Sequence, residues 1–194
     1  MKSLRGRIAL GALALVAVLG YVVVVDLGIH AGRVHRGVNV AGFDIGGLTE
    51  LEAFDALEER QELLAETPVV FTSNGFDCRA YPAVPDGLDE EEAPDLGWSP
   101  QPFNTANDAM AVGRGGIFEG LRERLDAWFG GYRIGWAGTV DPAKVDAFLD
   151  YCEENAEIVN ATIDRPKLRF RIRRAILTYP RAPTDFKVPL ERAG

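Results

Sequence analysis

The stretch VNVAGFDIGGLTELEAFDAL, residues 38–57, holds the signals that decide the fold. Its first half alternates apolar residues with small or polar ones, which predicts a short strand interrupted by a bend at residues 41–42. The glycine pair at residues 46–47 ends the strand. Apolar residues then recur at helical spacing, which indicates a helix. The stretch therefore predicts a unit of strand, glycine turn and helix.

A capping box marks the start of this helix. Thr49 and Glu52 lie three residues apart, so the hydroxyl and the carboxylate can each accept a hydrogen bond from a free backbone N–H. We predict that the helix ends near Glu66, ahead of Pro68. Its apolar residues form one stripe available for burial: Leu51, Phe54, Leu57 and Leu64.

An uncharged apolar run precedes this unit. Residues 8–25 contain no charge, and Lys2, Arg5 and Arg7 lie before them. The run is near the lower length limit of a membrane-spanning helix, and the basic residues favour a cytoplasmic N-terminus. We expect an uncleaved anchor because the run is longer than the core of a usual signal peptide. A cleaved signal peptide is the alternative, and in both cases the rest of the chain is exported.

The apolar run divides the chain into four parts. They are a basic cytoplasmic N-terminus at residues 1–7, the anchor at 8–25, a juxtamembrane linker at 26–36 and one extracytoplasmic domain at 37–194. His30 and His35 are the only histidines, and both fall in the linker. We therefore expect them to be solvated rather than catalytic or metal-binding.

The charge balance limits the partners of the exported part. The chain carries 21 basic and 29 acidic residues, and without the three basic residues of the N-terminus the net charge falls from −8 to −11. A domain of this charge should not bind nucleic acid or anionic lipid through its overall field. An acidic run at residues 89–92 predicts a solvated loop. We expect contact with the cytoplasmic membrane through the N-terminal helix.

The remaining elements predict an α+β domain. Asn74-Gly75 joins two strands in a hairpin, and helices are expected from Asn104 or Thr105 to Val112, over residues 117–129 and from Pro142 to about residue 155. A strand is expected at residues 132–136. This order predicts helices packed on a mainly antiparallel sheet, preceded by one N-terminal transmembrane helix.

Near the C-terminus the chain alternates strictly between apolar and basic residues. Leu168, Phe170 and Ile172 lie between four basic residues: Lys167, Arg169, Arg171 and Arg173. A period of two predicts a half-buried strand with a basic outer face, with residues 176–179 as its partner strand. Such a face could be solvated, or it could bind an anionic polymer or another protein.

Cys78 and Cys152 are the two cysteines, and both fall in the exported part. Each lies on a predicted apolar face, so buried free thiols and a disulfide remain equal alternatives. Neither has the spacing of a metal site, and we expect no metal and no cofactor.

Two separated motifs resemble one known family. Residues 37–53 have the pattern Gly-Val-x-Val-x-Gly-x-Asp-Ile-Gly-Gly-Leu-Thr-x-x-Glu-Ala, and Leu96-Gly97 is followed by a predicted short helix and Gly113-Arg114-x-Gly116. Together they resemble the YoaR-like peptidoglycan-binding domain, found in Gram-positive bacteria beside VanW and L,D-transpeptidase domains. The likeness is weaker after residue 116. Arg173-Arg174 stands where the family has a glycine-containing turn, and the chain resembles a short or truncated member.

The resemblance implies a membrane-anchored, extracytoplasmic module that binds or spaces the cell wall. Its partner would be peptidoglycan or an associated anionic polymer, with Trp98, Arg114 and Tyr132 as candidate contacts, because an aromatic ring can stack on a sugar and an arginine can pair with a carboxylate. The alternative is an interaction protein that docks onto another envelope protein, such as a wall enzyme. We expect no enzyme, because neither cysteine has the neighbours of a transpeptidase nucleophile and the predicted domain holds no histidine. A pair of catalytic carboxylates stays open.

Overall fold

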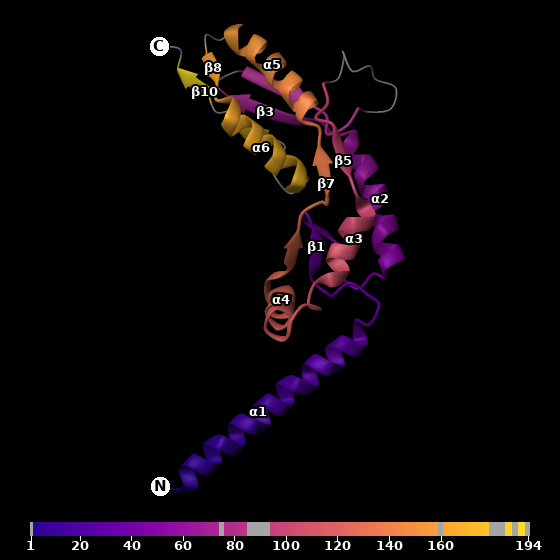
Figure 1. The fold of residues 1–194 in the computed structure, drawn as a ribbon, viewed down its shortest axis with the longest axis vertical. Helices are drawn as coiled ribbons and strands as arrows, with labels where there is room; N and C mark the ends of the chain where they lie inside the picture. The colour runs from indigo at the N-terminus through magenta and orange to yellow at the C-terminus, as the bar shows by residue number, and fades with distance from the viewer. Residues whose placement is uncertain are drawn as a thin grey trace.

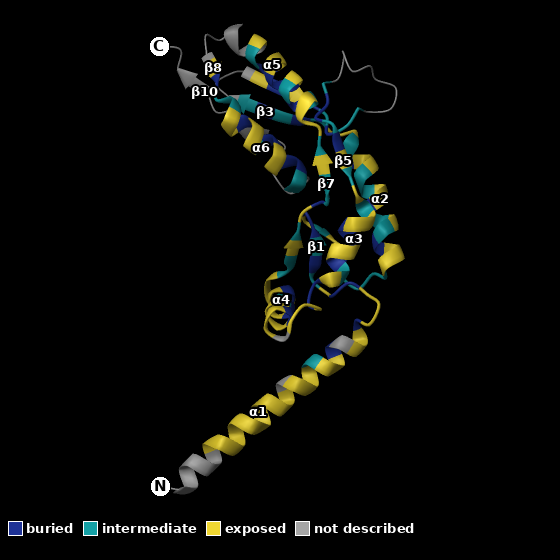
Figure 2. Cartoon of the chain, viewed as in Figure 1, coloured by how far each residue is buried: buried dark blue, intermediate teal, exposed yellow. Residues whose placement is uncertain are grey.

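One long helix extends from a domain of helices and small sheets (Figure 1). The structure, a computed structural model, describes residues 2–73, 76–84, 94–158, 161–178, 185–187 and 190–192. The long helix is α1 (Lys2–Ile29), and its segment Ile8–Asp26 has a mean hydropathy of 2.8. Figure 2 shows that α1 is exposed along most of its length. This helix is apolar and long enough to cross a membrane, as expected for an anchor or a signal sequence.

The predicted strand, turn and helix are all present. β1 (Val38–Val40) and β2 (Phe43–Asp44) pair antiparallel, and α2 (Glu50–Ala65) follows. The capping box is confirmed, because Glu52 N donates to Thr49 Oγ1 over 3.3 Å and Thr49 N donates to Glu52 Oε2 over 2.8 Å. One residue of the predicted stripe is wrong: Leu51 is exposed, and the buried positions of α2 are Ala53, Leu57 and Leu64.

β1 lies at the centre of the half of the domain nearest α1. It pairs with β2 on one edge and parallel with β6 (Tyr132–Ile134) on the other. α3 (Pro102–Ala111) packs against α2 and β1, and α4 (Ile117–Gly130) leads into β6. The predicted start of α3 at Asn104 or Thr105 is wrong, because the N-cap lies earlier in the chain. Gln101 occupies that position, while Thr105 is buried inside the helix and donates its hydroxyl to the Gln101 carbonyl.

The other half contains a second sheet covered by two helices. β3 (Val69–Ser73) pairs with β4 (Phe76–Ala80) as the predicted hairpin and parallel with β9 (Asp185–Lys187). α5 (Pro142–Ile158) packs on β4 and on α6 (Arg165–Thr178). Two strand pairs complete the domain: β5 (Trp98–Pro100) with β7 (Gly138–Val140), and β8 (Ala161–Ile163) with β10 (Leu190–Arg192).

The structure mixes helices with small sheets, which agrees loosely with the predicted α+β class, but the strands do not form one mainly antiparallel sheet. In the described residues they form four small sheets, and two of these contain a parallel pair. The hairpin turn at residues 74–75 and the acidic run at residues 89–92 lie outside the described residues.

The predicted basic strand is wrong, because residues 165–178 form the helix α6. Leu168, Ile172 and Ile176 are buried at a spacing of four residues, whereas Phe170 is exposed. Asp164 accepts a hydrogen bond from the backbone N–H of Lys167, which satisfies one free donor of the first turn. The apolar residues at period two were therefore misleading. Only alternate members of that series, four residues apart, face the core.

A disulfide joins the hairpin to α5. Cys78 on β4 and Cys152 on α5 are bonded, with their Cα atoms 5.6 Å apart. Both residues are fully buried beside the contact of Phe71 with Phe148, whose ring centroids lie 5.6 Å apart. Of the two alternatives for the cysteines, the structure has the disulfide, which is typical of an oxidising compartment outside the cytoplasm.

Candidate functional site

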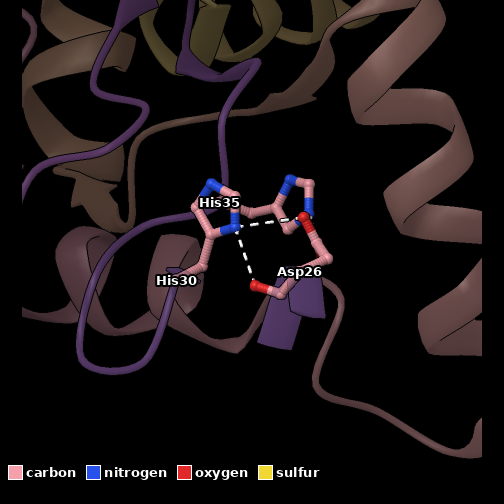
Figure 3. Close-up of side chains that lie close together, drawn as sticks. All are labelled: Asp26, His30 and His35. Atoms are coloured by element: carbon pink, nitrogen blue, oxygen red, sulfur yellow. Dashed lines mark hydrogen bonds and ion pairs between the residues drawn. The ribbon is translucent and has the colours of Figure 1, made fainter. Parts of the chain in front are cut away.

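Three ionisable side chains are buried together where α1 meets the domain (Figure 3). Asp26 comes from the last turns of α1, and His30 and His35 follow it. Their exposed fractions are 7%, 9% and 4%. The expectation of a solvated linker at residues 26–36 is therefore wrong. The first four of its residues continue α1, and Val34 is fully buried in the core.

The local chain path explains this burial. Asp26 and His30 are one helical turn apart, which places His30 Nδ1 3.1 Å from Asp26 Oδ1 and 3.0 Å from the Asp26 carbonyl oxygen. Val34 N donates to the Leu48 carbonyl over 2.7 Å, so the chain turns back along the domain. The His35 ring consequently stacks on the His30 ring, with centroids 4.5 Å apart.

His35 has an oxygen near each ring nitrogen. Nε2 lies 2.9 Å from Asp26 Oδ2, and Nδ1 lies 2.9 Å from the carbonyl oxygen of Arg36. A neutral imidazole has only one N–H, so its tautomer decides which of these two oxygens accepts a hydrogen bond from the ring.

Arg124 of α4 adds a buried cation. Its Nη1 lies 3.8 Å from Asp26 Oδ2, while Nε and Nη2 donate to the Gly113 carbonyl. Arg124 is only 5% exposed. Its Nη1 and His30 Nε2 are buried and have no hydrogen-bond partner among the described residues. Asp26 is therefore close to both Arg124 and His35, and its carboxylate compensates the buried guanidinium of Arg124.

A metal ion could be considered at this cluster, since two imidazoles and a carboxylate lie within 4.8 Å of one another. The ring orientation argues against it. A nitrogen lone pair lies in its ring plane, and the two rings are stacked with only 23° between their planes, so their lone pairs do not converge on one point about 2 Å from each nitrogen. The nearby Arg124 guanidinium would also repel a cation. The cluster instead acts as a polar clamp between α1 and the domain.

Arg114, one of the predicted contact residues, belongs to this clamp. Its Nη2 donates to the carbonyl oxygens of His30 and Arg33, at 2.9 and 2.7 Å. These carbonyls follow the C-terminal end of α1, where a cationic side chain is favourable. Arg114 thus holds the segment that links α1 to β1, and its planar group is already engaged there.

The structure separates the other two predicted contacts. Trp98 is buried on β5, with its ring edge-on to Trp136 at 5.6 Å, so it belongs to the core. Tyr132 on β6 is half-buried and donates its hydroxyl to Glu123 Oε1 over 3.2 Å. Burial, and then the negative charge of Glu123, raise the pKa of Tyr132 above its ordinary value. The phenol therefore stays protonated and acts as a donor.

A groove with an apolar lining lies beside α6, formed with β7 and the start of α5. Its volume is about 240 Å³, and Val140, Ile172 and Leu177 supply apolar lining. Arg169 and Arg173, two of the predicted basic residues, also line it and are exposed. One helical turn separates them, which places both on the same side of α6.

The four basic residues of α6 differ in their surroundings. Lys167 pairs with Asp164, and Arg169 pairs with Asp146 of α5. Arg171 is half-buried. Arg173 is exposed and makes no ion pair within the described part of the chain. Arg173 is therefore the member of the set best placed to meet an anion in the groove.

Comparison of the chain with family models, with curated proteins and with solved structures finds no match. The resemblance to the YoaR-like domain therefore rests on the motif residues in the sequence. The sequence reasoning missed the clamp because it treated His30 and His35 as part of a linker. The signal that could have found it is the spacing of four residues between Asp26 and His30 at the end of an apolar helix.

Proposed function

We propose that the chain is a membrane-anchored, extracytoplasmic and non-catalytic module that binds a cell-wall component in the groove beside α6. The observation that carries this proposal is the combination of an apolar lining with two exposed arginines on one side of one helix, Arg169 and Arg173. Apolar groove walls with a few polar groups are typical of ligand sites, and a guanidinium suits carboxylate and phosphate.

Three further observations support the proposed location and ligand. α1 is long and apolar enough to act as the anchor, and basic residues precede it. The disulfide between Cys78 and Cys152 is favoured in an oxidising compartment. The motif resemblance points to peptidoglycan. Stem-peptide carboxylates of peptidoglycan and phosphates of attached polymers are both anions that Arg173 could pair with.

The test is a pull-down of the full chain, in detergent micelles, with insoluble cell wall before and after its anionic polymers are removed. The full chain is needed because Asp26, which belongs to α1, is buried against the domain and would be lost with that helix. Binding that survives polymer removal supports direct recognition of peptidoglycan, and binding lost on removal assigns the groove to the anionic polymer.

The groove itself is tested with two neighbouring charge reversals. Arg173→Glu should lower binding about tenfold or more, because it removes a charged hydrogen bond and adds repulsion. Arg174→Glu makes the same charge change at the adjacent, exposed position that does not line the groove, so it should leave binding near that of the natural chain. Equal binding by the two variants would refute the groove. Absence of wall binding by the natural chain would refute the proposal and favour docking onto another envelope protein.

A further inference from the structure

α4 presents an apolar side that the described part of the chain covers only in part, with the Trp128 ring 6.0 Å from the ring of His35. Phe118 and Phe129 are 89% and 86% exposed, and the other members are partly exposed. The complete set is Phe118, Leu121, Leu125, Trp128 and Phe129. We call this set the α4 apolar face. Two exposed phenylalanines and a tryptophan on one helix are unusual for a surface in contact only with water.

The α4 apolar face is one continuous strip. At 3.6 residues per turn, its five members fall within an arc of about 100° around the helix axis. On one side of this arc lie the residues that face the domain, Gly120, Arg124 and Ala127, which are buried. On the other side lie the charged residues Glu119, Arg122 and Asp126, which are exposed. α4 is thus an amphipathic helix whose apolar side is directed away from the domain core.

The α4 apolar face adjoins the surface of α1. Val23 of α1 and Leu121 of α4 line one hollow of about 470 Å³, whose surface is mainly apolar. The charge contact between Arg124 and Asp26 fixes α4 at the end of the candidate span, which runs from Ile8 to Asp26. Figure 1 shows α4 at the end of the domain from which α1 extends. If α1 spans a bilayer, α4 lies at the level where hydrocarbon gives way to headgroups.

We propose that α4 lies in the outer surface of the membrane, with its apolar face inserted among lipids. This inference rests on the proposed anchoring role of α1. Amphipathic helices with aromatic residues settle at this depth, and tryptophan is enriched there. α4 carries the acidic residues Glu119, Glu123 and Asp126 against Arg122 and the buried Arg124. Its attachment should therefore depend on apolar burial and occur with zwitterionic lipid.

Insertion of α4 would give the domain a second point of attachment and fix its orientation. α1 alone would allow rotation about the helix axis, whereas two contacts with one plane restrict it. α6, which lines the groove, lies in the half of the domain distant from α1 (Figure 1), so the groove would lie away from the two points of attachment.

The test adds one tryptophan probe at a time to the full chain, which is reconstituted in phosphatidylcholine vesicles. The background is Trp128→Phe, which leaves only the buried Trp98 and Trp136. Phe118→Trp and Phe129→Trp report on α4, and Val16→Trp reports on the middle of α1. Phe170→Trp is the matched control, because it is an exposed apolar residue on α6. Lipids brominated near the headgroup end or the methyl end of the acyl chain quench nearby tryptophan.

The emission that each α4 probe adds to the Trp128→Phe background should fall by about half with bromine near the headgroups. It should fall less with bromine near the chain ends. The α1 probe should show the opposite order, and the Phe170→Trp probe should not respond. Quenching at α1 with none at α4 would overturn the inference and leave the anchor intact. No quenching at either would overturn the anchor itself. Unquenched α4 probes whose emission depends on the protein-to-lipid ratio would show that a second copy covers this face.

Discussion

Replacing Asp26 by alanine should strongly destabilise the domain, although Asp26 belongs to the apolar helix. Its carboxylate is 7% exposed, lies 2.9 Å from His35 Nε2 and lies 3.8 Å from Arg124 Nη1. Without it, Arg124 stays buried with no ion pair among the described residues, and Nε2 of His35 loses its hydrogen-bond partner. Removing one partner of a buried ion pair costs about 3–5 kcal/mol. For a domain of this size the melting temperature should fall by roughly 6–20 °C.

The measurement is thermal unfolding of the full chain in detergent, followed by near-ultraviolet circular dichroism. The control is Asp126→Ala, which removes the exposed ion pair of Asp126 with Arg122 on the same helix as Arg124. Exposed pairs contribute about 0–1 kcal/mol, so this variant should melt close to the natural chain. If Asp26→Ala shifted the melting temperature no more than Asp126→Ala does, the buried cluster would not hold α1 to the domain.

A second substitution separates lost pairing from lost packing. Adding Arg124→Met to Asp26→Ala removes the cation that was left uncompensated. The double variant should therefore be less destabilised than the sum of the two single variants, by about 0.5–3 kcal/mol. Strict additivity would mean that Asp26 and Arg124 act independently, despite their distance of 3.8 Å.

Four other predictions concern the frame that supports the two sites. Replacing the disulfide cysteines by alanine should lower the free energy of unfolding by about 2–4 kcal/mol, because the bond closes a loop with a sequence separation of 74. Adding a reductant to the natural chain should produce the same loss in a denaturant titration. Thr49→Ala should cost about 1 kcal/mol. Hydrogen bonds from Thr49 lower the pKa of Glu52 below its ordinary value of 4.5, so Glu52→Gln should destabilise the chain above that pH, and the difference should shrink as the pH falls through the lowered pKa. Gly37→Ala should destabilise the chain more than Gly47→Ala does, by about 1–3 kcal/mol as measured by calorimetry. Both glycines have positive φ, but only at Gly37 would an added Cβ lie 2.2 Å from a backbone oxygen, that of Ala127.

The elements predicted correctly from the sequence are those specified by neighbouring residues. Thr49 and Glu52 form the capping box because each reaches a free N–H three residues away, a relation that no distant contact alters. The same holds for the hairpin of β3 and β4, and for Gly130 and Gly131 at the end of α4. The strand pairings of β1 with β6 and of β3 with β9 were beyond prediction because they join segments far apart in the chain.

The error at α6 shows how a short pattern can fit two structures. Leu168, Phe170 and Ile172 satisfy a period of two, but Leu168 and Ile172 are also one helical turn apart. Ala175 and Ile176 extend the helical series and are buried with them. A longer window would have favoured the helix, because Phe170 fits only the strand. Part of the predicted basic face remains in the helix. Arg169 and Arg173, four apart, still share a surface.

The clamp at Asp26 and the α4 apolar face together suggest why the polar junction lies where it does. An aspartate at the end of an apolar helix would be costly to bury unless cations reached it, and Arg124 reaches it from the buried side of α4. The opposite side of the same helix carries Phe118 and Phe129. Because a helix is rigid over four turns, the contact of Arg124 with Asp26 also sets the height of these aromatic residues relative to the end of the candidate span. A substitution that breaks the clamp should therefore disturb both the stability of the domain and the depth of the α4 probes, whereas a change in the groove beside α6 should affect neither.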